Sequence, residues 1–239
     1  MIGSTGGASG RPGRRKPADV AAAGRADAPE AGGDTSAPRP KTARGEATRR
    51  AILSAAETVI GRQGYSEASI GAITREAGVA QGTFYIYFAS KDEVFSELVA
   101  DMGRMLRHVI NEATAGFDDR LAAEREGLRA FLTFVSTHPE LYRIVQEAQF
   151  VDPAAYRAYF RTFAEGYRAG LEKAAAAGEL RPGDATIRAW TLMGIARSLG
   201  EYQVVFEGGA AIDDLVASAH DLLENGLRCG RGPAGGDDG

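Results

Sequence analysis

Apolar residues recur at helical spacing almost throughout residues 45–229, which leaves few folds open to the chain. Side chains placed three, four and seven residues apart form one face of an amphipathic α-helix. Gly64 and Gly78 follow two of these stripes, and Ser69 and Asp184 precede two others, as expected for helix ends and N-caps. Sustained alternation of apolar and polar residues, the mark of a β-strand, does not occur. The sequence therefore predicts an all-α protein of about nine helices.

Residues 1–44 differ in composition from the rest of the chain. They are rich in Gly, Pro, Ala and Arg and contain neither an aromatic residue nor a leucine, so they cannot bury enough apolar surface to offset the entropy of ordering. Eight basic and four acidic residues give this segment a charge of +4, and the whole-chain charge of −4 then leaves −8 for the remainder. We predict disordered tails at 1–44 and 230–239. The basic end of an acidic protein can attract nucleic acid by itself.

Several classes of protein are not indicated by this sequence. It has no run of eighteen apolar residues that would span a membrane, and its N-terminus lacks the apolar stretch of a secretory signal. Cys229 is the only cysteine, which excludes an intrachain disulfide and agrees with a reducing compartment. His108, His138 and His220 are far apart and have no cysteine or carboxylate at ligand spacing. We expect a cytoplasmic protein with no metal, no cofactor and no membrane partner.

Residues 69–88 carry the pattern of two short helices separated by a tight turn. Ser69 is a good N-cap for the first helix, and Gly78 supplies the turn, where a side chain would clash. Ile73 and Val79 are placed to lock the two helices together. In a helix-turn-helix the second helix must be short, rigid and free on one face to enter the major groove of DNA. The segment therefore predicts a helix-turn-helix unit.

Residues 69–92 read SIGAITREAGVAQGTFYIYFASKD. This run resembles the DNA-binding signature of the tetracycline-repressor (TetR) family of bacterial transcription regulators, in which Ala-Gly-Val-Ser is followed by Gly-Thr-Leu-Tyr, Tyr-Phe and Ser-Lys-Glu. The resemblance extends over residues 45–98. Three positions depart from the signature: Ala80 stands where Ser or Thr is usual, Gly71 where a polar residue is common, and Thr74 where alanine is usual.

The resemblance implies a homodimeric, ligand-responsive regulator with a helix-turn-helix DNA-binding domain at 45–91 and a helical bundle for ligand binding and dimerisation at 92–229. Such a protein binds palindromic double-stranded operator DNA, usually as a repressor, and a small-molecule effector releases it. Base contacts then fall on Gln81 and Thr83, because Gln can form two hydrogen bonds with adenine and Thr can touch the thymine methyl group. The resemblance assigns phosphate contacts to Ser69, Tyr85, Tyr87 and Lys91, and core positions to Phe84 and Phe88.

The second half of the chain holds most of the aromatic residues. These residues serve an ordinary core or line a ligand pocket between helices, since both use the same residue types. The resemblance implies a pocket, and its apolar character favours a lipophilic effector. The run HPELYR at 138–143 resembles a subgroup linked to fatty-acid or acyl-thioester metabolism. The residues predicted to line the pocket are Phe131, Tyr142, Gln146, Phe163, Tyr167, Trp190 and Met193.

Residues 184–206 carry apolar side chains on two sides of the expected helix, whereas a lone surface helix needs only one apolar stripe. One side holds Trp190 and Tyr202, and small residues such as Gly194 permit close approach. The second stripe predicts a four-helix contact between two copies of the chain, together with the last helix. The residues predicted for this dimer interface are Leu192, Ile195, Leu199, Phe206, Leu215 and Leu222.

Two other classes of function compete with a ligand-controlled regulator. An enzyme needs a nucleophile, an acid–base pair or a metal cluster, and the sequence offers no paired carboxylates, no Cys–His pair and no phosphate-binding glycine loop. We therefore expect no enzymatic activity and no cofactor. A non-specific architectural DNA-binding protein is the second alternative, but such a protein has no need of an aromatic-rich helical bundle after the helix-turn-helix.

Overall fold

The computed structural model describes residues 42–206 and 209–226. The predicted tails up to residue 41 and from residue 230, as well as Cys229, lie outside these ranges. In the described ranges the chain forms nine α-helices and no strand, which confirms the predicted all-α fold. The helices are α1 (Ala43–Gln63), α2 (Ile70–Glu76), α3 (Gln81–Tyr87), α4 (Lys91–Thr114), α5 (Arg120–Thr137), α6 (Pro139–Val151), α7 (Pro153–Ala176), α8 (Ala185–Val204) and α9 (Ile212–Asn225).

Short polar side chains begin most of these helices by accepting hydrogen bonds from free backbone N–H groups. The predicted caps Ser69 and Asp184 both do so, at the starts of α2 and α8. At α1 the Thr42 hydroxyl accepts from the Gly45 N–H at 3.1 Å. The first helix therefore begins at Ala43, two residues before the predicted start, because the cap lies within the segment predicted to be a tail.

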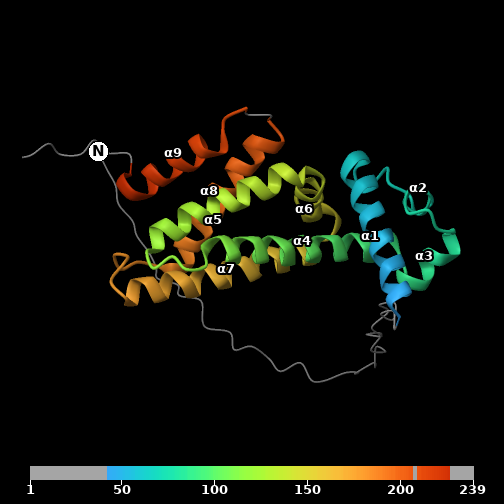
Figure 1. The fold of residues 1–239 in the computed structure, drawn as a ribbon, viewed down its shortest axis with the longest axis horizontal. Coiled ribbons are helices and arrows are strands. Elements are labelled where there is room, and N and C mark those ends of the chain that lie inside the picture. Colours follow the sequence, from blue (N-terminus) through green and yellow to red (C-terminus); the bar gives the residue numbers. More distant parts are fainter. Residues whose placement is uncertain (1–41, 207–208, 227–239) are drawn as a thin grey trace, which may run out of the picture. The chain divides into compact units, whose positions relative to one another are not determined.

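The arrangement of the helices separates α1–α3 from most of the bundle. In Figure 1, α1, α2 and α3 gather at one end of α4, whereas α5 and α7 run alongside the rest of α4, and α8 and α9 lie beside α5. No helix of the described ranges is long and apolar enough to cross a lipid bilayer. α4 is thus the element that runs from the helix-turn-helix into the bundle.

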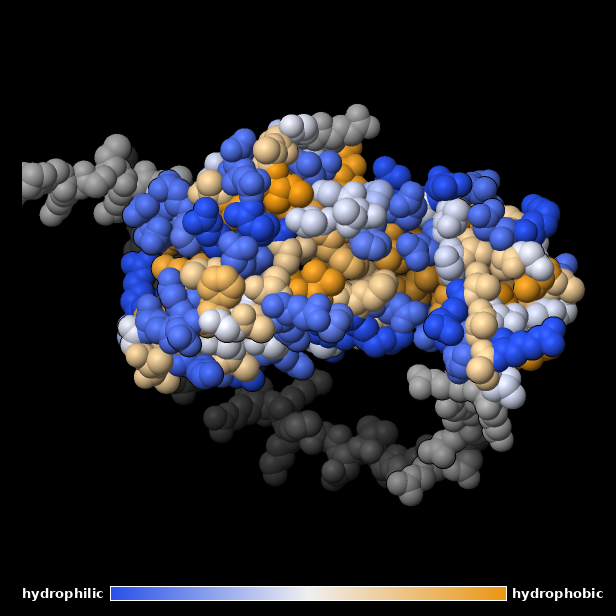
Figure 2. All heavy atoms as spheres, in the orientation of Figure 1, coloured by the Kyte–Doolittle hydropathy of each residue, from blue (hydrophilic) through white to orange (hydrophobic). Residues whose placement is uncertain are grey.

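The core has two parts. The larger part joins α1, α3, α4 and α6, and the predicted core residues Phe84 and Phe88 are confirmed there with no exposed surface. The smaller part lies between α5 and α9 and is centred on Leu132 and Val216. Figure 2 shows hydrophobic residues along the hollow between α4 and α5, with hydrophilic residues on either side.

α1 and α6 cross at very short range. A Cβ atom added at Gly61 would lie 2.4 Å from the Cβ of Glu140 and 2.9 Å from its Cα, so only glycine allows this approach. A few residues further on, the Glu147 carboxylate of α6 accepts from the Tyr65 N–H, with distances of 2.9 and 3.0 Å to its two oxygens. The end of α1 is therefore anchored to the bundle through α6 as well as through α4.

Candidate DNA-binding and effector sites

α3 presents a continuous exposed face to solvent. Gln81 and Gly82 at its start are exposed, and one turn later Tyr85 and Ile86 are 51% and 62% exposed. These four positions lie on one side of the helix, because residues four apart are stacked on the same face. Phe84, on the opposite side, is fully buried. The exposed face is the one available to a DNA groove.

The predicted base- and phosphate-contacting residues of α3 fall at different places around it. Gln81 and Tyr85 belong to the exposed face, whereas Thr83 and Tyr87 are half-buried at its edges. Sequence reasoning missed Ile86, which is the most exposed large hydrophobic side chain of α3. Its pattern resembles that of a core residue, because only the packing of α2 and α4 leaves this side of α3 open.

α2 braces α3 through a tight turn, as predicted, and Ile73 is completely buried. The predicted clash at Gly78 is wrong, because a Cβ there would meet no atom within 4 Å. Glycine is favoured instead by its φ of +66°, which side chains rarely adopt. Thr74 replaces the alanine usual in the resembled signature, yet it is accommodated: it is buried, and its hydroxyl donates to the Gly71 carbonyl at 3.2 Å. Ala80 provides no side-chain cap for α3, as its lack of a hydroxyl predicts.

Two of the predicted phosphate contacts have structural partners within the chain. The Ser69 hydroxyl, although exposed, accepts from the Ala72 N–H at 3.1 Å. The half-buried Lys91 ammonium donates to the carbonyls of Tyr65 and Ala68 at 2.6 and 2.8 Å and lies 4.0 Å from the centroid of the Tyr65 ring. Lys91 therefore fastens the loop between α1 and α2 to the start of α4, and its contact with phosphate stays a prediction.

Replacing Lys91 by alanine should reveal both roles. Loss of the ammonium leaves two carbonyls without their donor, so we expect the free energy of unfolding to fall by about 1–3 kcal/mol. Loss of a phosphate contact should also reduce the slope of log K against log salt by about one for DNA binding. Denaturant titration and binding at several salt concentrations measure the two effects separately. An unchanged salt slope would leave Lys91 with the structural role alone.

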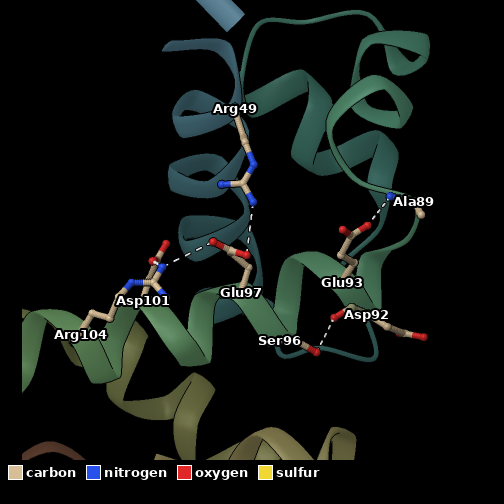
Figure 3. Close-up of polar contacts among 8 residues, drawn as sticks. All are labelled: Arg49, Ala89, Asp92, Glu93, Ser96, Glu97, Asp101 and Arg104. Atoms are coloured by element: carbon tan, nitrogen blue, oxygen red, sulfur yellow. Dashed lines mark hydrogen bonds and ion pairs between the residues drawn. The ribbon is translucent and has the colours of Figure 1, made fainter. Parts of the chain in front are cut away.

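A polar network holds the helix-turn-helix firmly on α4 (Figure 3). Glu97 of α4 forms an ion pair with Arg49 of α1 at 3.2 Å, and the Arg49 guanidinium lies 4.8 Å from the centroid of the Phe88 ring. Glu93 accepts from the Ala89 N–H between α3 and α4. The first two turns of α4 are thus joined to α1 through Glu97 and to the segment between α3 and α4 through Glu93.

Six of the seven predicted pocket residues line one narrow cavity in the bundle, with a volume of about 60 Å³. The six are Phe131, Tyr142, Gln146, Phe163, Tyr167 and Met193. Sequence reasoning missed the contribution of α4, namely Leu106 and Ile110, because their apolar stripe has the same pattern as ordinary packing. The cavity is thus walled by the same helix that carries the helix-turn-helix.

Few polar side chains line the cavity. The Tyr142 hydroxyl donates to the Arg197 carbonyl at 3.0 Å, and burial raises the pKa of Tyr142 to about 12. Burial also raises the pKa of Glu124, although the Arg120 guanidinium that pairs with it acts in the opposite direction. The Tyr167 phenol has a raised pKa because it is buried and lies beside Glu124. The cavity therefore offers neutral phenols and apolar walls, which suit a lipophilic chain.

A second, wider cavity of about 600 Å³ adjoins the first and shares four residues with it, Phe163 and Tyr167 among them. Its lining mixes charges of both signs, with Arg107, Arg120 and Lys173 facing Asp118, Glu124 and Glu179. We refer to it as the polar cavity.

In the part of the chain that the structure describes, no cluster of His, Cys, Asp and Glu could hold a metal ion.

The seventh predicted pocket residue, Trp190, does not line the apolar cavity. Its side chain is 46% exposed and lies in a groove of about 200 Å³ between α7 and α8. The reason is its place on α8: the inward positions are taken by Ala189 and Met193, so the neighbouring tryptophan falls at the edge of the helix contact. Trp190 therefore lies beside the apolar cavity and not in its wall, and its contact with a ligand stays a prediction.

The predicted dimer residues divide into two groups. Leu192, Ile195 and Leu199 are half-buried and face α5 or α9 of the same chain, and Ile195 and Leu199 also line an open groove between α8 and α9. The outer side of α8 and the residues that follow it carry an exposed apolar stripe, of which only Phe206 was predicted for the interface. Ile187, Tyr202, Val205 and Phe206 in this stripe are 63%, 42%, 50% and 69% exposed.

Beside this stripe an open groove of about 570 Å³ runs between α8 and α9. Gly194 and Ser198 leave space on the α8 side of it, and Leu215 and Leu222 form its α9 side. A groove of this kind, bordered by exposed apolar residues, suits a helix of a second copy.

Residues 52–98 match the family model described as bacterial regulatory proteins, tetR family. Solved structures share the fold at low sequence identity. FadR of Bacillus subtilis in complex with stearoyl-CoA is 19% identical over 75% of this chain and 99% of that one, with a TM-score of 0.68. FadR of Bacillus halodurans, described as a fatty acid degradation regulator, is 23% identical over 76% of this chain and 96% of its own, with a TM-score of 0.68. AibR in complex with isovaleryl coenzyme A and operator DNA is 15% identical over 73% of this chain and 97% of its own, with a TM-score of 0.61. The family and the structures are those of transcriptional regulators and not of enzymes.

Proposed function

We propose that this chain is a transcriptional regulator of the tetR family, a repressor that binds palindromic operator DNA as a homodimer and is released by a small lipophilic effector. The observation that carries the proposal is the exposed face of α3, with Gln81 and Tyr85 free to reach base edges and backbone on a helix braced by α2 and α4. The DNA-binding domain then comprises residues 45–91, and the ligand-binding and dimerisation domain comprises 92–229.

The effector that fits best is an acyl thioester. Two proteins of the same fold were solved with stearoyl-CoA and isovaleryl coenzyme A. The apolar cavity of this chain supports a similar ligand, since phenylalanine, leucine and isoleucine side chains make up much of its wall. Ligand pockets for small molecules are usually about 300–1,000 Å³. The cavity here, at about 60 Å³, is closed by comparison, so an acyl chain enters only if the surrounding helices move apart.

Movement of α4 then links the effector to the DNA. α4 contributes Leu106 and Ile110 to the cavity wall, and its N-terminal turns hold α1 and α3 through Glu97 and Glu93. In a dimer, the two recognition helices must match half-sites about 34–36 Å apart or at a multiple of that distance. A ligand that shifts α4 changes this spacing. The coupling is reciprocal and of order 1–3 kcal/mol, because effector and DNA must weaken each other equally.

Selection of bound duplexes from a random DNA library by the full chain tests this function. We expect enrichment of an inverted repeat that resists competitor DNA, and weaker binding when palmitoyl-CoA is added. Binding without any sequence preference would instead support the non-specific architectural class. Equal affinity of palmitoyl-CoA for the free and the DNA-bound protein would contradict the proposed release.

Gln81→Ala should weaken binding to the selected duplex by about 1–3 kcal/mol and relax the preference at one position in each half-site. The physical reason is the loss of a side chain that can form two hydrogen bonds with adenine from the exposed face of α3. Gln149→Ala, on α6 and outside the helix-turn-helix, serves as the control. Titration of duplexes that carry single-base changes measures both effects. A uniform loss of affinity over all duplexes would argue against base reading by Gln81.

A further inference from the structure

The groove between α7 and α8 that holds Trp190 has an unusual combination of side chains. Three arginines line it, Arg157 and Arg161 from α7 and Arg197 from α8, together with aromatic residues that include Trp190. No acidic residue belongs to its lining. We call it the arginine groove.

The arginines of this groove lack close acidic partners. Among the described residues, no carboxylate oxygen lies within 4.0 Å of any of the three guanidinium groups, and Arg157 interacts with Asp152 only over a longer distance. The polar cavity is different, because its Arg120 is paired with the buried Glu124 and its basic residues face an equal number of acidic ones. Of the polar cavity and the arginine groove, which both adjoin the apolar cavity, the arginine groove is thus the one without paired acidic groups.

The arginine groove is continuous with the apolar cavity. Phe160, Met193 and Arg197 line both spaces, so a molecule with an apolar chain in the cavity can place its other end in the groove. Guanidinium groups bind phosphate through paired, charge-assisted hydrogen bonds. An exposed indole offers a flat face on which an aromatic base can stack, and such stacking stabilises nucleotide binding.

We propose that the arginine groove binds the phosphate-bearing nucleotide head group of the effector, with Arg157 and Arg161 on its phosphates and Trp190 against its base. The inference rests on the proposed acyl-thioester effector and adds where its head group lies. The acyl chain then occupies the apolar cavity, and the polar cavity is left free. The groove thereby distinguishes an acyl-CoA from the corresponding fatty acid.

Trp190 makes the test direct, because it is the only tryptophan of the chain. Its fluorescence should change on addition of palmitoyl-CoA, which has both chain and head group, and of free coenzyme A, which has the head group alone. Palmitate, which lacks the head group, should bind by calorimetry with little change in this signal. Binding of palmitoyl-CoA should weaken as salt is raised, since Arg157 and Arg161 are exposed to solvent.

The double variant Arg157→Ala, Arg161→Ala should weaken palmitoyl-CoA binding by about 10-fold to 100-fold, because it removes two charge-assisted contacts. Its affinity for palmitate should stay within about twofold of the original, as no contact with the apolar cavity is lost. Both side chains are exposed, so the variant should remain folded, which circular dichroism verifies. Arg168→Ala on the same helix is the matched control, since Arg168 is equally exposed and lies outside the groove.

The possible results test the proposed effector class and the proposed role of the arginine groove separately. If the unaltered protein binds neither palmitate nor palmitoyl-CoA, the proposed effector is wrong and the groove loses its assigned ligand. If both bind but the double variant weakens them equally, or if Lys173→Ala in the polar cavity weakens palmitoyl-CoA instead, the effector class stands and the groove assignment is overturned.

Discussion

Ser198→Arg should convert the protein to a monomer and weaken operator binding by about 100-fold or more. Ser198 lies in the open groove between α8 and α9, where a second copy would pack, and it is exposed in the single chain. An arginine there places an unpaired charge in the centre of the interface. Joining two DNA-binding units makes the second contact intramolecular, which raises affinity by about 10²–10⁴, so a monomer loses that factor.

Analytical ultracentrifugation and operator titration measure the two effects of this substitution. Ser136→Arg is the matched control, because Ser136 is an exposed serine on α5 outside the groove. It should leave both the oligomeric state and the affinity unchanged. If Ser198→Arg remains dimeric, the interface lies elsewhere, and the exposed stripe of Ile187, Tyr202 and Val205 has another partner.

Gly61→Leu should lower the free energy of unfolding by about 3 kcal/mol or more, because the first atom of any side chain at Gly61 already lies 2.4 Å from the Cβ of Glu140. For a chain of this size, such a loss corresponds to a fall in melting temperature of about 6–12 °C. Thermal and denaturant unfolding followed by circular dichroism measure it.

Gly166→Leu is the matched control for that substitution. Gly166 is also helical, but a Cβ there meets no atom within 4 Å. Leucine favours the helix over glycine by up to about 1 kcal/mol, so the control should be neutral or slightly stabilising. If both substitutions lowered the free energy of unfolding equally, the stability of the protein would not depend on the close approach of α1 and α6.

The sequence predicts most, but not all, of the buried and exposed positions of α3. The family resemblance implies core positions for Phe84 and Phe88, and both are fully buried. It also implies that Gln81 faces outward, and Gln81 is exposed. It did not single out Ile86, since an isoleucine is predicted to be buried wherever a core is near, and whether α2, α4 or solvent covers that side depends on packing.

The lining of the apolar cavity follows from the sequence only in part. Six predicted residues meet around it because the inner faces of helices in a bundle carry both core and pocket residues. The tertiary structure decides which of these side chains leave a void, and it adds Leu106 and Ile110 from α4. Trp190 lies outside this wall because Ala189 and Met193 take the inward positions of α8, which leaves Trp190 at the border of the inward and outward faces.

The sequence by itself determined the nine helices of the described ranges, their principal caps and the helix-turn-helix, because these features depend on residues a few positions apart. Only the tertiary structure decided that Lys91 holds the loop at Tyr65 and Ala68, and that Glu147 binds the Tyr65 N–H from 82 residues away. Helical periodicity shows that a side is apolar without showing which neighbour it meets. Contacts between distant segments depend on how whole helices pack, and no local pattern records that packing.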